Sequence, residues 1–107
     1  MCGISGIYNY QDKNINAENI IKNIIKLQDK RGPDNSNYWR SDCNKVFFGH
    51  NRLSIIDLSI NANQPFVSED KNYSITFNGE IYNYKLIKEE LKKNKINFKS
   101  NSDTEVI

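Results

Sequence analysis

The sequence predicts a domain of mixed α and β structure, in the α+β class. A short apolar run over residues 4–8, and the alternation of apolar and polar residues over 73–77, are typical of β-strands. Apolar residues recur at helical spacing over 20–27 and again over 86–91. At 107 residues, the chain has the length of one small domain or of part of a larger one.

A helix should follow the first strand. Asn16 can cap this helix, because an asparagine side chain accepts a hydrogen bond from a backbone N–H of the first turn. The apolar positions place the helix over residues 17–29, and Gly32 and Pro33 favour a turn that ends it.

The middle of the chain is predicted to consist mainly of strands and loops. Residues 46–50 and 53–56 are apolar enough for two strands with a kink between them. The alternating strand at 73–77 should have one buried face and should end at Asn78 and Gly79, a pair that often forms a turn.

The last third of the chain is predicted to hold two helices. Apolar residues over 86–91 share one face of the first helix. Ser102 and Glu105 have the spacing of a capping box, which opens a helix. That helix would have completed only about one turn at Ile107, so we expect the domain to be incomplete at its C-terminus.

Composition and charge exclude several classes of protein. The 15 basic and 13 acidic residues leave a net charge of +2, which is too balanced to predict a nucleic-acid or anionic-membrane partner. No stretch approaches the ~20 apolar residues of a membrane span, and no signal peptide is visible. Two cysteines make no disulfide framework, and no Cys/His spacing fits zinc. We therefore expect a cytoplasmic protein whose present segment holds no metal and no cofactor.

The N-terminus offers a candidate nucleophile. Removal of Met1 would leave Cys2 with a thiol and a free α-amine on one residue. An α-amine titrates near pKa ~8 and a thiol near ~8.5, so the amine can serve as the base that activates the thiol. On position alone, an ordinary reduced cysteine is the favoured interpretation of Cys2, and only the rest of the chain changes that.

Three further segments hold residues suited to acyl transfer from an amide. Arg52, at the predicted kink, carries a guanidinium that can clamp a carboxylate. Asn78 and Gly79 offer a carboxamide and an open backbone N–H, which can meet an oxyanion. Glu80 and Asp103 offer carboxylates that can hold an ammonium group. Each residue alone has an ordinary alternative as an ion pair, a turn or a helix cap, and only the joint pattern indicates a site.

In order and spacing, these motifs resemble the N-terminal glutaminase domain of glutamine-hydrolysing asparagine synthases. Those domains are class II glutamine amidotransferases of the N-terminal-nucleophile hydrolase type. The matching segments cover essentially the whole chain: Met1-Cys2-Gly3-Ile4, Arg31-Gly32-Pro33-Asp34, residues 49–57, Gln64-Pro65, residues 78–83 and residues 102–107. The resemblance implies an αββα sandwich with two stacked, mostly antiparallel sheets, of which residues 1–107 are the N-terminal portion.

The resemblance also implies a reaction, the hydrolysis of L-glutamine to glutamate and ammonia. Cys2 is then the nucleophile that forms a thioester after Met1 is removed, and its α-amine is the general base. Asn78 and the Gly79 N–H form the oxyanion hole. His50 is given no catalytic role and is expected to be packed and hydrogen-bonded within its strand.

Substrate binding is implied for three more residues. Arg52 binds the α-carboxylate of glutamine, and Glu80 and Asp103 hold its α-amino group. Two positions depart from the family pattern, where a histidine commonly stands at Lys30 and a glycine at Ala62. Because of these departures, an alternative stays open: an amidotransferase of the same family that transfers the ammonia to a cell-surface sugar and not to aspartate.

The resemblance further implies a partner domain. A C-terminal synthetase domain, absent from this chain, would bind ATP with Mg and aspartate and would use the ammonia. The full-length protein could form a homodimer. A third possibility is an inactive fragment of a disrupted or incomplete gene. Residues 1–107 expressed alone are expected to be inactive.

Overall fold

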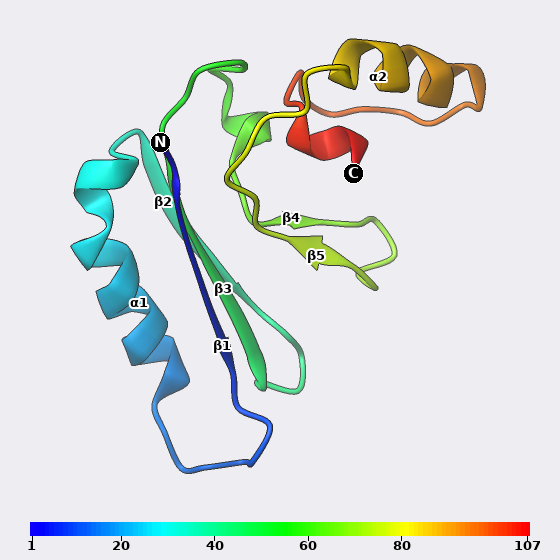
Figure 1. Ribbon diagram of the computed structural model, residues 1–107. Helices are drawn as coiled ribbons and strands as arrows, with labels where there is room; N and C mark the ends of the chain where they lie inside the picture. The colour runs from blue at the N-terminus through cyan, green and yellow to red at the C-terminus, as the bar shows by residue number, and fades with distance from the viewer.

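The computed structural model describes residues 1–107, which fold into two antiparallel sheets, two α-helices and three short 3-10 helices. The larger sheet has three strands in the order β1-β3-β2, and α1 lies along one of its faces (Figure 1). The smaller sheet is the hairpin β4–β5, and α2 lies beyond it near the C-terminus (Figure 1). The predicted α+β class is confirmed.

The larger sheet is built on its central strand. Its strands are β1 (Gly3–Tyr8), β2 (Asn35–Arg40) and β3 (Val46–Arg52). Strand β3 pairs on both sides, with Gly3 opposite Asn51 and Asn35 opposite Arg52. The predicted strand over 53–56 is wrong, because β1 and β2 offer no further partners beyond Arg52. The backbone N–H groups of residues 53 and 54 bond to side chains instead.

Strand β2 was not predicted from the sequence. Its residues Asn-Ser-Asn-Tyr-Trp-Arg are mostly polar and show no apolar alternation. The strand forms because two aromatic side chains pack on opposite faces of the sheet. Tyr38 packs against the core under α1, and the Trp39 ring lies 5.7 Å from the Phe48 ring between centroids.

Helix α1 (Ala17–Leu27) confirms the predicted amphipathic helix, and the Asn16 side chain accepts the predicted capping bond from the Asn19 N–H. Its buried face forms the core of the larger sheet. The buried members of this core are Ala17, Ile21, Ile25 and Phe47. Gly49 of β3 lets the helix approach closely, since a Cβ there would lie only 2.9 Å from Ile25 Cγ1.

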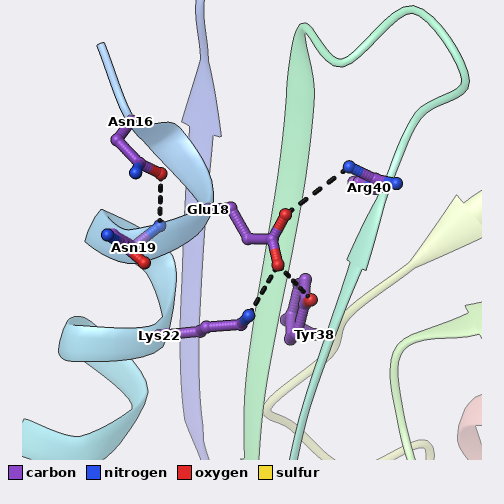
Figure 2. A network of polar contacts seen from close by, with 6 residues as sticks. All are labelled: Asn16, Glu18, Asn19, Lys22, Tyr38 and Arg40. Carbon is purple, nitrogen blue, oxygen red and sulfur yellow. Dashed lines mark hydrogen bonds and ion pairs between the residues drawn. The ribbon is translucent and has the colours of Figure 1, made fainter.

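A polar network fastens α1 to β2 on the surface (Figure 2). The Glu18 carboxylate accepts from Lys22 at 2.6 Å and from the Tyr38 hydroxyl at 2.8 Å, and Arg40 lies 3.5 Å away. Lys22, followed by Tyr38, lowers the pKa of Glu18. The network is exposed, so we expect it to orient the helix more than to stabilise the fold.

The turn after α1 packs directly on β3 at Gly32. A Cβ on Gly32 would lie 2.3 Å from the Asn51 carbonyl oxygen and 2.6 Å from the Arg52 nitrogen. These are backbone atoms of the central strand and cannot move aside cheaply. Gly32 therefore sets the distance between this turn and the end of β3.

We expect Gly32→Ala to lower the free energy of unfolding by about 3 kcal/mol, the upper part of the range for overpacking. Gly6→Ala is the matched control, because its Cβ would meet Phe48 at an ordinary 3.5 Å. Urea denaturation of both variants measures the difference. Equal stabilities would show that the turn can shift away from the strand.

The second half of the chain has two short strands and one α-helix. It contains β4 (Phe66–Val67), β5 (Ser74–Ile75) and α2 (Tyr84–Lys93). Strand β5 is shorter than the predicted strand at 73–77. Helix α2 is confirmed, but its expected apolar face is not deeply buried: Leu86 is 70% exposed and Lys88 is the buried residue.

The predicted C-terminal capping box is wrong. Residues 104–106 form a single 3-10 turn without a side-chain cap. The Glu105 carboxylate accepts from the backbone N–H groups of Lys99 and Ser100, at 2.7 and 2.8 Å, and does not reach Ser102. Two other 3-10 turns span Asp29–Arg31 and Ile60–Ala62. Neither α-helix is both long and apolar enough to cross a membrane.

Candidate functional site

One cavity brings together residues from distant parts of the chain. Its volume is about 430 Å³, and it lies where β1 begins, where β3 ends and where the chain leaves β5. Five of the six residues predicted to form the site line it: Cys2, Arg52, Asn78, Gly79 and Glu80. The sixth, Asp103, does not line the cavity, although its neighbours Ser102 and Thr104 do.

Strand pairing places Cys2 at this cavity. The register of Gly3 opposite Asn51 puts Cys2 beside Arg52 at the end of the sheet. The half-buried Cys2 sulfur accepts from the Leu53 N–H at 3.3 Å and lies 3.7 Å from the Leu53 carbonyl oxygen. Arg31 donates to the Cys2 carbonyl at 3.4 Å. The thiol is thus held at the cavity by backbone contacts at the end of the sheet.

Arg52 is buried, with 7% of its surface exposed. Its Nη1 donates to the Ser59 carbonyl and to Asn63 Oδ1, each at 2.8 Å, and its Nη2 donates to the Asp57 carbonyl. Three of the five guanidinium N–H donors therefore hold the loop at 57–63. The other two have no acceptor within the protein. Arg52 therefore has an architectural role that the sequence did not predict.

Asn78 and Gly79 lie where the chain turns away from β5. The Asn78 side chain is half-buried and has no hydrogen-bond partner within the protein. Gly79 does not adopt a positive φ. A Cβ on this residue would lie 2.6 Å from the Phe77 ring, so a larger residue would require that ring to shift. The segment therefore presents a free carboxamide and an open backbone N–H at the cavity.

The two predicted ammonium-binding carboxylates differ in setting. Glu80 lines the cavity and is exposed. Asp103 is 6% exposed, and its Oδ2 accepts from the Ile81 N–H at 2.9 Å. Asp103 thus holds the segment that carries Gly79 and Glu80, and its second oxygen bonds to no protein group.

His50 was expected to be packed and hydrogen-bonded. It is fully buried and borders the cavity, but neither ring nitrogen makes a hydrogen bond of normal geometry. Burial lowers the pKa of His50, the Phe77 backbone opposes that shift and Arg52 adds to it. The lowered pKa favours the neutral form of the His50 imidazole, which avoids a second cation near Arg52.

Comparison with known proteins identifies the family to which these residues belong. Residues 1–107 match the sequence model of a family described as a glutamine amidotransferase domain. The chain belongs to this family. No solved structure matches the chain.

Several curated relatives of this glutamine amidotransferase domain match over its full length. Glutamine-hydrolysing asparagine synthetase 1 of Bacillus subtilis (strain 168) is 42% identical over 109 residues, and asparagine synthetase B of Escherichia coli (strain K12) is 33% identical over 107. The amidase chry2 of Gibberella zeae is 37% identical over 116 residues. The chain spans only 17%, 19% and 17% of these three relatives.

Asp57 is a residue of the amidotransferase domain whose role sequence reasoning missed. Its carboxylate accepts from the Asn101 N–H at 2.6 Å and from the Ser59 N–H at 2.7 Å. These donors, Asn101 first, lower the pKa of Asp57. Because the folded-state pKa lies below the unfolded value, this stabilisation is complete at neutral pH and is lost as the pH falls through the folded-state pKa.

The bonds of Asp57 tie the loop held by Arg52 to the segment that leads to Asp103. The spacing of Asp57 and Ser59 is that of an Asx turn, which was the available sequence signal. No group of three or more His, Cys, Asp or Glu side chains could hold a metal ion. The absence of a cofactor from this segment stays a prediction.

Proposed function

We propose that this domain hydrolyses L-glutamine to glutamate and ammonia through a thioester on Cys2. The observation that carries the proposal is the single cavity lined by Cys2, Arg52, Asn78, Gly79 and Glu80, which are scattered over most of the sequence. Its volume of about 430 Å³ lies within the range of small-molecule sites. Family membership supports the same chemistry.

The proposed reaction begins at the Cys2 sulfur. Once Met1 is removed, the α-amine of Cys2 takes the thiol proton, and the thiolate attacks the carboxamide carbon of glutamine. The negative charge that develops on the carboxamide oxygen is met by the Asn78 carboxamide and the Gly79 N–H. The protonated amine gives its proton to the departing nitrogen, so ammonia leaves and a thioester remains. Water, activated by the same amine, then releases glutamate.

Substrate orientation is proposed for the charged residues around the cavity. Arg52 binds the α-carboxylate of glutamine through its two free N–H donors, a geometry for which guanidinium is suited. Glu80 contacts the α-ammonium group directly, and Asp103 supports it with negative charge from its buried position. With the α-carboxylate and the α-ammonium group both held at the α-carbon, the carboxamide at the other end of glutamine can extend toward the Cys2 thiol.

We propose that the ammonia serves ATP-dependent amidation of aspartate in a synthetase domain that binds ATP with Mg. The support is that relatives of this domain are named glutamine-hydrolysing asparagine synthetases. The larger sheet would be one layer of an αββα sandwich. Ile4 and Tyr8, 45% and 66% exposed on the face of β1 opposite α1, support a second layer there. Homodimer formation and a cytoplasmic location stay predictions.

Arg52→Lys tests substrate binding. Loss of a charge-assisted contact should raise KM for glutamine by about 10-fold to 100-fold, while a simple amide without an α-carboxylate should keep its KM. Since Arg52 also holds the loop at 57–63, the melting temperature should fall as well. Equal losses for both substrates would show that Arg52 acts only through the loop.

The proposal as a whole is tested by incubating the protein, with every residue that its gene encodes, with L-glutamine and measuring glutamate and ammonia. We expect equal amounts of both products, no turnover of D-glutamine, and a protein mass that shows Met1 removed. Turnover by a protein that retains Met1 would rule out the α-amine as the base. Absence of turnover by protein lacking Met1 would overturn the proposed function.

A further inference from the structure

Gln64 makes two long-range hydrogen bonds from a buried position. Its side chain is 6% exposed and borders the cavity. Its Oε1 accepts from the Phe77 N–H at 2.6 Å, and its Nε2 donates to Thr104 Oγ1 at 3.1 Å. The Phe77 N–H requires an acceptor, which fixes the orientation of the carboxamide.

Each partner of Gln64 adjoins a proposed site residue. Phe77 directly precedes Asn78, the proposed oxyanion donor, and Thr104 directly follows Asp103. Because peptide units are planar and their bond lengths are fixed, a shift of Phe77 or Thr104 moves the neighbouring residue with it. The Gln64 carboxamide therefore spans two segments that no regular secondary structure joins.

The residue before Gln64 completes the connection. Asn63 Oδ1 accepts from Arg52 Nη1 at 2.8 Å. Residues 63 and 64 thus touch the segments that carry the proposed carboxylate-binding, oxyanion-binding and ammonium-binding groups. Of residues 63 and 64, only Gln64 contacts two of these segments with one side chain.

We propose that Gln64 is a positioning residue that sets the placement of Asn78 relative to Asp103 in the glutamine site. The proposal rests on the proposed function. Gln64 does not touch the reacting atoms; it acts through the two segments that its carboxamide joins. Loss of the Phe77 bond should displace the oxyanion donor, and loss of the Thr104 bond should displace the ammonium-binding side.

Two substitutions distinguish the Phe77 bond of the Gln64 carboxamide from its Thr104 bond. Both are made in the protein with every residue that its gene encodes. Gln64→Met keeps the side-chain length and removes both bonds, so kcat should fall by about 10²-fold, the scale of a misplacement near 1 Å, and KM should rise. Thr104→Val removes only the acceptor of Nε2. It should raise KM for glutamine by about 10-fold and change kcat by less than about 3-fold.

Glutaramate, the analogue of glutamine without an α-amino group, sharpens the test. If Thr104→Val acts through the ammonium-binding side, the KM for glutaramate should be unchanged. A stability control is Ile21→Val. Ile21 is fully buried in the core under α1 and does not line the cavity. Its truncation should lower the melting temperature and leave kcat and KM of the folded protein unchanged.

The outcomes decide between positioning and mere packing. The expected pattern is a kcat loss specific to Gln64→Met and a KM loss specific to glutamine in Thr104→Val. Unchanged kinetics in Gln64→Met, or losses that simply follow melting temperature across all three variants, would overturn the role of Gln64 while wild-type turnover upholds the proposed function. No turnover in the wild-type protein would overturn both.

Discussion

Cys2→Ala should abolish glutamine hydrolysis. The Cys2 sulfur is the only thiol at the cavity, and it is positioned by the Leu53 backbone at the end of the sheet. Loss of a catalytic nucleophile lowers kcat by about 10⁴-fold or more. Glutamine binding should survive, because Arg52 and Glu80 are untouched. Steady-state hydrolysis and calorimetric binding measure the two effects separately.

Cys43→Ala is the matched control for this prediction. Cys43 is exposed in the turn between β2 and β3 and does not line the cavity. Ser41 lowers the pKa of Cys43, so this thiol should react with alkylating reagents even without a catalytic role. Chemical labelling alone is therefore ambiguous. If Cys43→Ala lost hydrolysis and Cys2→Ala retained it, the nucleophile would be Cys43 and not Cys2.

Periodic segments of the fold could be predicted from the sequence, and polar or irregular ones could not. The helical spacing of apolar residues over 20–27 predicted α1, and two of these residues, Ile21 and Ile25, are buried in the core. Ile20 and Leu27 belong to the same pattern but are 41% and 86% exposed. Apolar content was also misleading at Ile55, which is 68% exposed in a loop beside the cavity. Composition does not reveal which segments have strand partners.

The candidate site shows a similar division. The motifs predicted residues that meet at one cavity. Strand pairing brings two of them, Cys2 and Arg52, to the same end of the sheet. The motifs could not reveal the bonds that hold the site together. The backbone acceptors of Arg52 and the carboxamide contacts of Gln64 join residues up to 40 positions apart. Such contacts depend on the conformation of the loops, which local sequence patterns do not predict.

Asn78→Ala should lower kcat by about 10²-fold to 10³-fold with little change in KM. The Asn78 carboxamide is free of protein partners at the cavity, so its removal costs no folded-state hydrogen bond. An oxyanion donor acts mainly on charge that develops in the transition state, which places the loss in kcat and not in substrate affinity. Asn78→Asp should lower kcat further, since it sets a negative charge beside the oxyanion.

Asn83→Ala provides the matched control for Asn78. Asn83 lies five residues further on at the start of α2, makes no side-chain capping bond and does not line the cavity. Its replacement should leave kcat and KM unchanged. If Asn78→Ala altered only KM, Asn78 would be a substrate contact or a turn residue, and the Gly79 N–H would be left as the sole proposed oxyanion donor. A kcat loss shared equally by both variants would point to displacement of the whole segment and not to a donor at Asn78.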